Sequence, residues 1–319
     1  MEEHEDDQYC FQDRNSSCRK TSMSTFIYIT LYTFFSLISV VTVFLNLLVI
    51  ISISHFKQLH TPTNLLILSL AVSDLLVGLI VIPAMTVAIL EPCWVLGEYF
   101  CVLFLFASFS CTSLSLGNLI LISIDRYVAV CDPLMYHSKI TTSRIRCCIA
   151  LTWCCCIIYN VVLMKVLVNV QVPSRCFEEC YFSEGFISGI IMDLVISLVA
   201  PCSIIITLYL KIFVVARSHA RKLYSNEAAS GVKTVQANKS ERKATKTLVI
   251  IVFNYLICWI PMYFLQLIYD ASNDSSSAFI CFPLLFNSLV NPIIYALFYP
   301  WFKVTAKRIL TLKLRLYTP

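Results

Sequence analysis

The sequence predicts an all-α membrane protein, a bundle of seven transmembrane helices followed by a short amphipathic cytoplasmic helix. Of its 319 residues, 58% are hydrophobic and only 13% are charged, and the mean hydropathy of +0.78 is too high for a soluble protein. A helix needs about 20 apolar residues to cross a bilayer, so apolar windows of that length locate the spans. The predicted spans are residues 25–53, 64–90, 99–130, 145–167, 186–215, 247–269 and 278–299.

The distribution of charge predicts the orientation of the chain and its division into three parts. About nineteen of the 24 basic residues flank the spans on one side, and such an excess marks the cytoplasmic side. The acidic amino terminus lies on the other side, and we expect the first span to direct insertion without a signal peptide. We therefore expect an extracellular amino terminus (residues 1–24), a seven-helix domain (25–299) and an amphipathic helix with a short cytoplasmic tail (300–319). The net charge of +5 comes from the cytoplasmic loops and does not indicate nucleic-acid binding.

The last span contains an interruption and is followed by an amphipathic segment. Asn291 and Pro292 lie within the span, and a proline removes one backbone hydrogen bond, so the helix can bend and rotate there. Three aromatic residues follow within 299–302, and Lys303 and Lys307 come next. This pattern is typical of a short helix that lies along the lipid headgroups.

Residues on the predicted outer side indicate covalent modification. Six cysteines lie there and are expected to form disulfides, although six cysteines permit fifteen pairings and spacing alone does not choose among them. The motif that begins at Asn15 is a predicted glycosylation acceptor. All five histidines lie outside the spans, so no zinc site is expected within the bundle. The outer cysteines are Cys10, Cys18, Cys93, Cys101, Cys176 and Cys180.

Asp74, near the middle of the second span, is the first of two carboxylates that lie deep in the membrane. Such a carboxylate costs about 3 kcal/mol even on lenient insertion scales and therefore requires partners. Ser115, Asn287 and Asn291 lie at similar depth in the third and seventh spans. Hard oxygen ligands around one carboxylate suit a small cation. The alternative is a water-linked polar network without an ion.

Asp193 is the second deep carboxylate, about two turns into the fifth span from the outside. Apart from Arg126 at the inner end of the third span, no lysine or arginine occurs in the second, third, sixth or seventh span, so this carboxylate has no predicted basic partner at its own depth. Its counter-ion would then arrive from outside, and a protonated amine gains more from such a pair in a partly dehydrated site than in bulk water. The alternative is a hydrated polar residue without a ligand.

Aromatic residues of the sixth span suggest the rest of a pocket. Trp259 and Tyr263 are four residues apart and share a helix face, and Pro261 between them can kink the helix. Aromatic faces also attract ammonium groups. The alternative for each ring is ordinary packing in the core.

A charged triplet, Asp125, Arg126 and Tyr127, lies at the inner end of the third span. Arg126 can pair with Asp125 and be released when the helices move, which would make the pair a two-state latch. Tyr209 and Tyr295, near the inner ends of the fifth and seventh spans, could bind Arg126 in the alternative arrangement.

Together these motifs resemble the rhodopsin-like G-protein-coupled receptors over essentially the whole chain, and among them the trace amine-associated receptors. The closing sequence N-S-x-x-N-P-x-x-Y-x-x-x-Y-x-W-F is similar to the signature of that subfamily at every fixed position. The other matching marks are Asn46, L-A-V-S-D ending at Asp74, Cys101, D-R-Y at 125–127, Trp153, Pro201, C-W-I-P at 258–261 and N-P-I-I-Y at 291–295.

The resemblance implies roles for several residues and a cellular setting. Cys101 would pair with Cys180 and Cys18 with Cys176, while Asp74, Ser115, Asn287 and Asn291 would form a sodium site. Trp259 would act as the activation toggle, and Arg126 would meet the carboxyl-terminal helix of a G protein. Most such receptors lie in the plasma membrane of olfactory sensory neurons and signal through the stimulatory proteins Gs or Golf to cyclic AMP. The implied activation residues are Asp125, Arg126, Tyr127, Tyr209, Tyr295, Pro261 and Pro292.

One departure from the aminergic pattern bears on the ligand. The third-helix aspartate that usually holds the ammonium group is replaced by Ser108, and the usual seventh-helix aromatic residues are replaced by Leu285 and Phe282. Asp193 occupies the fifth-helix position where some fish members carry a compensating aspartate, so the amine would bind in a reversed orientation. Whether it is a monoamine or a diamine stays open. The expected ligand-binding residues are Asp193, Ser108, Trp259, Tyr263, Met262 and Ser197.

Other classes of protein fit the sequence less well. A receptor for a non-amine odorant or a peptide would share every scaffold feature, and only Asp193 argues against it. A retinal protein needs a Schiff-base lysine, yet no lysine occurs between Lys246 and Lys303. A transporter would show repeated halves, and an enzyme would show a nucleophile with its base. We therefore expect no catalytic residue and no cofactor other than the sodium ion, with an amine, a G protein and membrane lipid as partners.

Overall fold

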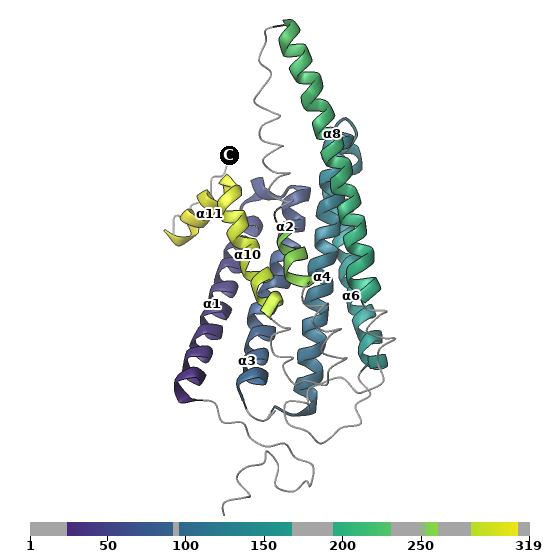
Figure 1. Ribbon diagram of the computed structural model, residues 1–319. Helices are drawn as coiled ribbons and strands as arrows, with labels where there is room; N and C mark the ends of the chain where they lie inside the picture. The colour runs from purple at the N-terminus through teal and green to yellow at the C-terminus, as the bar shows by residue number, and fades with distance from the viewer. Residues whose placement is uncertain are drawn as a thin grey trace, which may run out of the picture.

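The computed structural model describes residues 24–91, 96–167, 194–230, 250, 253–260 and 282–311, and every long element in this part is a helix. Figure 1 shows the helices as a bundle, with α11 turning away from α10. The first half contains α1 (Thr25–His55), α2 (Pro62–Leu76), α3 (Ile82–Leu90) and α4 (Gly97–Cys131). The short α5 (Tyr136–Lys139) and the long α6 (Thr142–Leu167) follow. The second half contains α8 (Ala200–Ser230), the helical residues 253–260, α10 (Phe282–Phe298) and α11 (Pro300–Leu310).

Five described helical segments are long and apolar enough to cross a membrane. They coincide with the first four predicted spans and with the described part of the fifth, and α10 contributes a shorter apolar helix, Leu285–Phe298. Apolar side chains such as those of Leu37 and Val40 on α1 point away from the core, as expected for surface that contacts lipid tails. The five membrane-crossing segments are Thr25–His55, Pro62–Leu90, Tyr99–Cys131, Thr142–Lys165 and Val195–Val215.

Two wide helical turns lie beside prolines. The π-helical turn η3 (Val77–Val81) joins α2 to α3 just before Pro83, and η5 (Val195–Val199) precedes α8 and Pro201. Proline has no N–H to donate to the preceding turn, so the helix relaxes its hydrogen-bond pattern there instead of ending. The spans therefore continue as predicted, with local bulges that the hydrophobic windows do not reveal.

The helix α8 is longer than the fifth predicted span. The span was expected to end at residue 215, yet α8 continues as one helix to Ser230. Residues 216–230 contain neither glycine nor proline and are rich in helix-forming residues such as alanine, arginine and lysine. Figure 1 shows the far end of α8 extending beyond the neighbouring helices.

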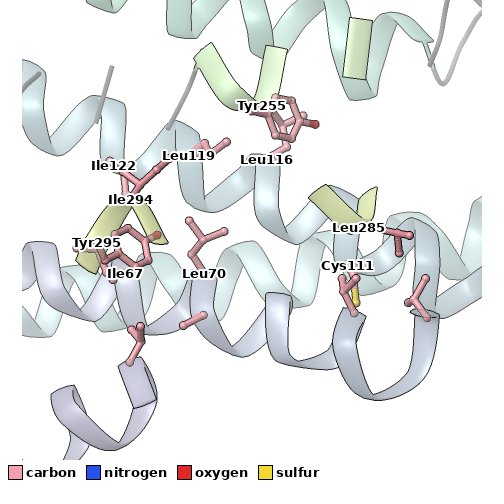
Figure 2. Close-up of a cluster of buried hydrophobic side chains, with 14 of the residues drawn as sticks. Ile67, Leu70, Cys111, Leu116, Leu119, Ile122, Tyr255, Leu285, Ile294 and Tyr295 are labelled. Atoms are coloured by element: carbon pink, nitrogen blue, oxygen red, sulfur yellow. The ribbon is translucent and has the colours of Figure 1, made fainter. Parts of the chain in front are cut away.

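The core lies where α2, α4, α10 and the residues 253–260 meet. Figure 2 shows buried side chains from these four segments grouped together. Close approach of helices also depends on small residues: a Cβ atom on Gly117 of α4 would lie 2.5 Å from Cγ2 of Thr152 on α6. The labelled residues of the cluster are Ile67, Leu70, Cys111, Leu116, Leu119, Ile122, Tyr255, Leu285, Ile294 and Tyr295.

Candidate functional site

The predicted latch is closed in this structure. Arg126 donates to Oδ2 of Asp125 from Nε at 2.9 Å and from a terminal nitrogen at 2.6 Å. The Asp125 side chain is 0% exposed and that of Arg126 is 13% exposed, so the pair is largely shielded from water. A buried carboxylate is tolerated only when charge and hydrogen bonds compensate for its lost hydration.

Two further residues complete the latch, and sequence analysis did not assign them. Thr63, in the first turn of α2, donates to Asp125 at 2.9 Å and accepts from Arg126 at 2.6 Å. Tyr136 on α5 donates to the other carboxylate oxygen of Asp125 at 2.9 Å. Burial raises the pKa of Tyr136 above its ordinary value and the charge of Asp125 raises it further, so the phenol stays protonated and can donate at neutral pH. The latch is therefore Asp125, Arg126, Thr63 and Tyr136.

Three tyrosines near the latch carry buried hydroxyl groups that form no hydrogen bond in the described part of the chain. Sequence analysis named Tyr209 and Tyr295, and the structure adds Tyr299, between α10 and α11. Tyr209 and Tyr299 interact electrostatically with Arg126, whereas Tyr295 contacts Tyr299 with ring centroids 6.2 Å apart. The position of Tyr299 directly before Pro300, where the helix must break, is a signal that could have drawn attention to it.

The helices α4 and α8 are also in contact next to the latch. Nζ of Lys211 on α8 lies 5.9 Å from the ring centroid of Tyr127 on α4. This cation–π contact joins the third residue of the charged triplet to the helix that carries Tyr209.

The four residues of the predicted sodium site are all buried, and two of them are in direct contact. Nδ2 of Asn291 donates to Oδ2 of Asp74 at 2.9 Å, across α10 and α2. Ser115 lies 3.4 Å from Ser73, the neighbour of Asp74, with either hydroxyl able to donate. The exposed fractions of Asp74, Ser115, Asn287 and Asn291 are 0, 2, 1 and 1%. We call these four residues the Asp74 cluster.

The Asp74 cluster has spare oxygen ligands. Oδ1 of Asp74 and Oδ1 of Asn291 are buried and accept no hydrogen bond from the described residues. A carboxylate oxygen and an amide oxygen without donors are the type of ligand that a sodium ion takes from a protein, with water completing the shell. The residues present therefore fit the ion that the family resemblance implies.

Asn254 extends this polar network to the sixth helix, and sequence analysis missed it. Its Nδ2 donates to Oδ1 of Asn287 at 3.3 Å, and the Cys258 thiol lies 3.9 Å from its Oδ1. The rings of Tyr255 and Trp259 follow on the same segment, with centroids 5.7 Å apart. An asparagine in an otherwise apolar run was the available signal, because a polar group at that depth needs partners.

The predicted ligand pocket is described only in part. Ser108 on α4 is partly buried, and its hydroxyl donates to the Phe104 carbonyl oxygen at 2.8 Å. Trp259 is 2% exposed, and Ser197 lies in η5 and is partly buried. Among the other predicted residues, Asp193, Pro261, Met262 and Tyr263 lie outside the described residues. Pro292 lies inside α10 and is buried.

The disulfide predictions are also tested only in part. Cys101 is disulfide-bonded, and the other cysteines in the described ranges are free thiols. Cys18, Cys176, Cys180 and the glycosylation motif at Asn15 lie outside the described residues.

Comparison with known proteins identifies the family. The profile described as "7 transmembrane receptor (rhodopsin family)" matches residues 45–295. Trace amine-associated receptor 13c of Danio rerio is 36% identical over 98% of this chain and 95% of its own length. Trace amine-associated receptor 8 of Homo sapiens is 37% identical over 95% and 92%, and receptor 9 of Mus musculus is 38% identical over 95% and 90%. The chain therefore belongs to the trace amine-associated receptors, multi-pass membrane receptors of the rhodopsin family that couple to G proteins and are not enzymes.

Proposed function

We propose that this receptor detects an amine whose ammonium group pairs with Asp193, and that it signals through Gs or Golf to cyclic AMP in olfactory sensory neurons. The observation that carries the proposal is that the outer part of α4 offers no carboxylate to an ammonium group. Between residues 99 and 124 this helix contains no carboxylate, and the Ser108 hydroxyl is hydrogen-bonded to a carbonyl of its own helix. An ammonium group therefore needs a carboxylate from another helix, and Asp193 is the one that the sequence supplies.

The buried side chains suggest how such binding reaches the cytoplasm. Trp259 lies one turn above Tyr255 and Asn254, and Asn254 is hydrogen-bonded to Asn287 of the Asp74 cluster. A shift of the sixth helix around Trp259 and Pro261 would disturb this contact and the helices that carry it. Arg126 would then leave Asp125 and bind Tyr209 and Tyr295, whose hydroxyls have no hydrogen bond in the closed arrangement. The inner ends of the helices would thereby open to the carboxyl-terminal helix of the G protein.

A sodium ion in the Asp74 cluster would favour the closed arrangement. When bound, it would supply positive charge between α2 and α10, next to the spare oxygens of Asp74 and Asn291. The Asp74 side chain holds Asn291 in place, so movement of α10 would change the geometry of the site. Agonist and sodium would therefore oppose each other through linkage between the two states.

The proposal also covers the extracellular surface and the helix α11. We assign the pairs Cys101–Cys180 and Cys18–Cys176, glycosylation at Asn15, and an extracellular amino terminus before the seven-helix domain. The amphipathic helix α11 would lie along the inner headgroups, because its apolar Phe302 is buried and Lys303 is exposed.

A cyclic AMP reporter in cells that express the chain tests the amine assignment. A panel of alkyl, aryl and polyamines should contain an agonist, and Asp193→Asn should abolish the response at matched surface expression. Asp132→Asn, which removes an exposed cytoplasmic carboxylate, is the control and should leave potency unchanged. Ser108→Asp should alter the preferred amines by adding a charge to α4. Responses only to neutral or acidic odorants would reject the proposal in favour of a non-amine receptor.

A further inference from the structure

A second carboxylate lies at the outer end of the bundle, far from the latch. Glu91 directly follows α3, and its Oε1 accepts hydrogen bonds from Tyr28 at 2.8 Å and from Tyr32 at 2.7 Å. The two tyrosines are one turn apart on α1, and their ring centroids are 4.8 Å apart at an interplanar angle of 54°. These three residues, the Glu91 cluster, place one negative charge beside two aromatic rings.

The charge of Glu91 has no counter-ion in the described part of the chain. Both ion pairs there, Arg126–Asp125 and Lys139–Asp132, lie at the opposite, cytoplasmic end. The two phenols donate to the same oxygen, and Oε2 accepts no hydrogen bond from the described residues. All three side chains are partly exposed, so a solute or a lipid headgroup can reach them from the extracellular side.

We propose that the Glu91 cluster is an ammonium-binding subsite. The carboxylate supplies charge and the two rings supply cation–π attraction, a combination that suits an ammonium or quaternary ammonium group. A small metal ion fits less well, because it requires several hard oxygen ligands and the cluster offers one carboxylate. Two sources carry the required chemistry: a free amine in the extracellular medium and the choline headgroup of an outer-leaflet lipid. The free-amine case rests on the proposed function, as an entry site or as the second contact of an extended diamine.

The affinity of this subsite should be modest. An exposed ion pair and an exposed cation–π contact each contribute little, so together they should change the apparent affinity for an amine by about three- to tenfold. The main anchor would stay at Asp193. A larger effect would mean that Glu91 rather than Asp193 is the primary site.

The same three residues also join α1 to α3, and a charge-neutral variant separates this structural role from binding. Glu91→Gln keeps an oxygen that accepts from both phenols but removes the negative charge. The contact between the helices should therefore survive in this variant, while attraction for a cation should not. Ser39→Ala is the matched control, because it removes a hydrogen bond of 2.8 Å from α1 to the carbonyl oxygen of Gly78 in η3 and leaves all three residues of the cluster in place.

The test compares wild type, Glu91→Gln, Ser39→Ala and Asp193→Asn at equal surface expression. In the first arm, amine potency is measured in the cyclic AMP assay, and Glu91→Gln should lose three- to tenfold while Ser39→Ala stays near wild type. In the second arm, the purified receptor is melted in nanodiscs of phosphatidylcholine or phosphatidylglycerol. A melting-temperature loss for Glu91→Gln in phosphatidylcholine alone would assign the subsite to the headgroup.

A loss of amine potency in the first arm or of melting temperature in the second supports the subsite. Wild-type behaviour of Glu91→Gln in both arms overturns it. An equal loss for Glu91→Gln and Ser39→Ala would also overturn it, since that pattern belongs to weakened packing of α1 and not to a lost charge. The proposed function is judged separately by Asp193→Asn. If only Asp193→Asn loses the response, the amine assignment stands without the subsite; if only Glu91→Gln does, the subsite stands and the assignment fails.

Discussion

Substitution of Asp125 by asparagine should activate the receptor without agonist. In the closed latch, Arg126 is 13% exposed and faces a carboxylate that is 0% exposed, so neutralising Asp125 leaves a largely buried positive charge without its partner. Breaking a buried pair in this way typically costs about 3–5 kcal/mol. The substitution destabilises the open arrangement less, because Arg126 has moved to other partners there.

We take about 2 kcal/mol as the difference between the two states, which shifts their ratio roughly 30-fold. A receptor that is about 1% open would then become about one quarter open. Basal cyclic AMP, measured without agonist and normalised to surface expression, should rise severalfold or more. Thr63→Val should produce a smaller rise, because it removes hydrogen bonds to both partners but keeps their charges.

Asp132→Asn provides the matched control for this experiment. The Asp132–Lys139 pair is 2.7 Å long, close to the 2.6 Å of the latch, but its side chains are 40 and 52% exposed. An exposed pair contributes at most about 1 kcal/mol, so the same chemical change should leave basal signalling unchanged. Equal basal activity in Asp125→Asn and wild type, with Arg126 still able to couple, would refute the argument from burial.

Three further predictions concern the sodium site, the open arrangement of the latch and the packing of α4 against α6. Asp74→Asn should abolish any difference in agonist affinity between sodium chloride and potassium chloride, measured by competition binding, because it removes the charge on the Asp74 cluster. Tyr295→Phe should lower the basal signal of Asp125→Asn by about tenfold, because Arg126 loses a buried hydroxyl partner in the open state; an unchanged basal signal in the double variant would contradict this role. Gly117→Ala should lower the melting temperature by overpacking against Thr152, and Thr152→Ala should restore most of the loss.

Much of the candidate site was predictable because its signals are local in the sequence. Asp125 and Arg126 are neighbours, so their pairing needed only the correct placement of the third span. Asp74 and Asn291 lie 217 residues apart, yet both were recognisable as polar groups at similar depth in apolar helices. Asn254 carried the same kind of signal and was missed, whereas Thr63 and Tyr136 carried none, since threonine and tyrosine acquire a role only from the groups that they meet.

The sequence by itself determined that the chain is a bundle of membrane helices, and it located the five spans that the structure describes. Hydrophobic length and flanking charge are properties of single segments, and the bilayer acts on each segment separately. Tertiary structure alone decided that Thr63 and Tyr136 meet Asp125, that Tyr28 and Tyr32 meet Glu91, and that Tyr299 lies near Arg126. These contacts join helices that are distant in the chain, and their partners depend on how each helix is rotated and packed, which the hydrophobic pattern of one segment does not specify.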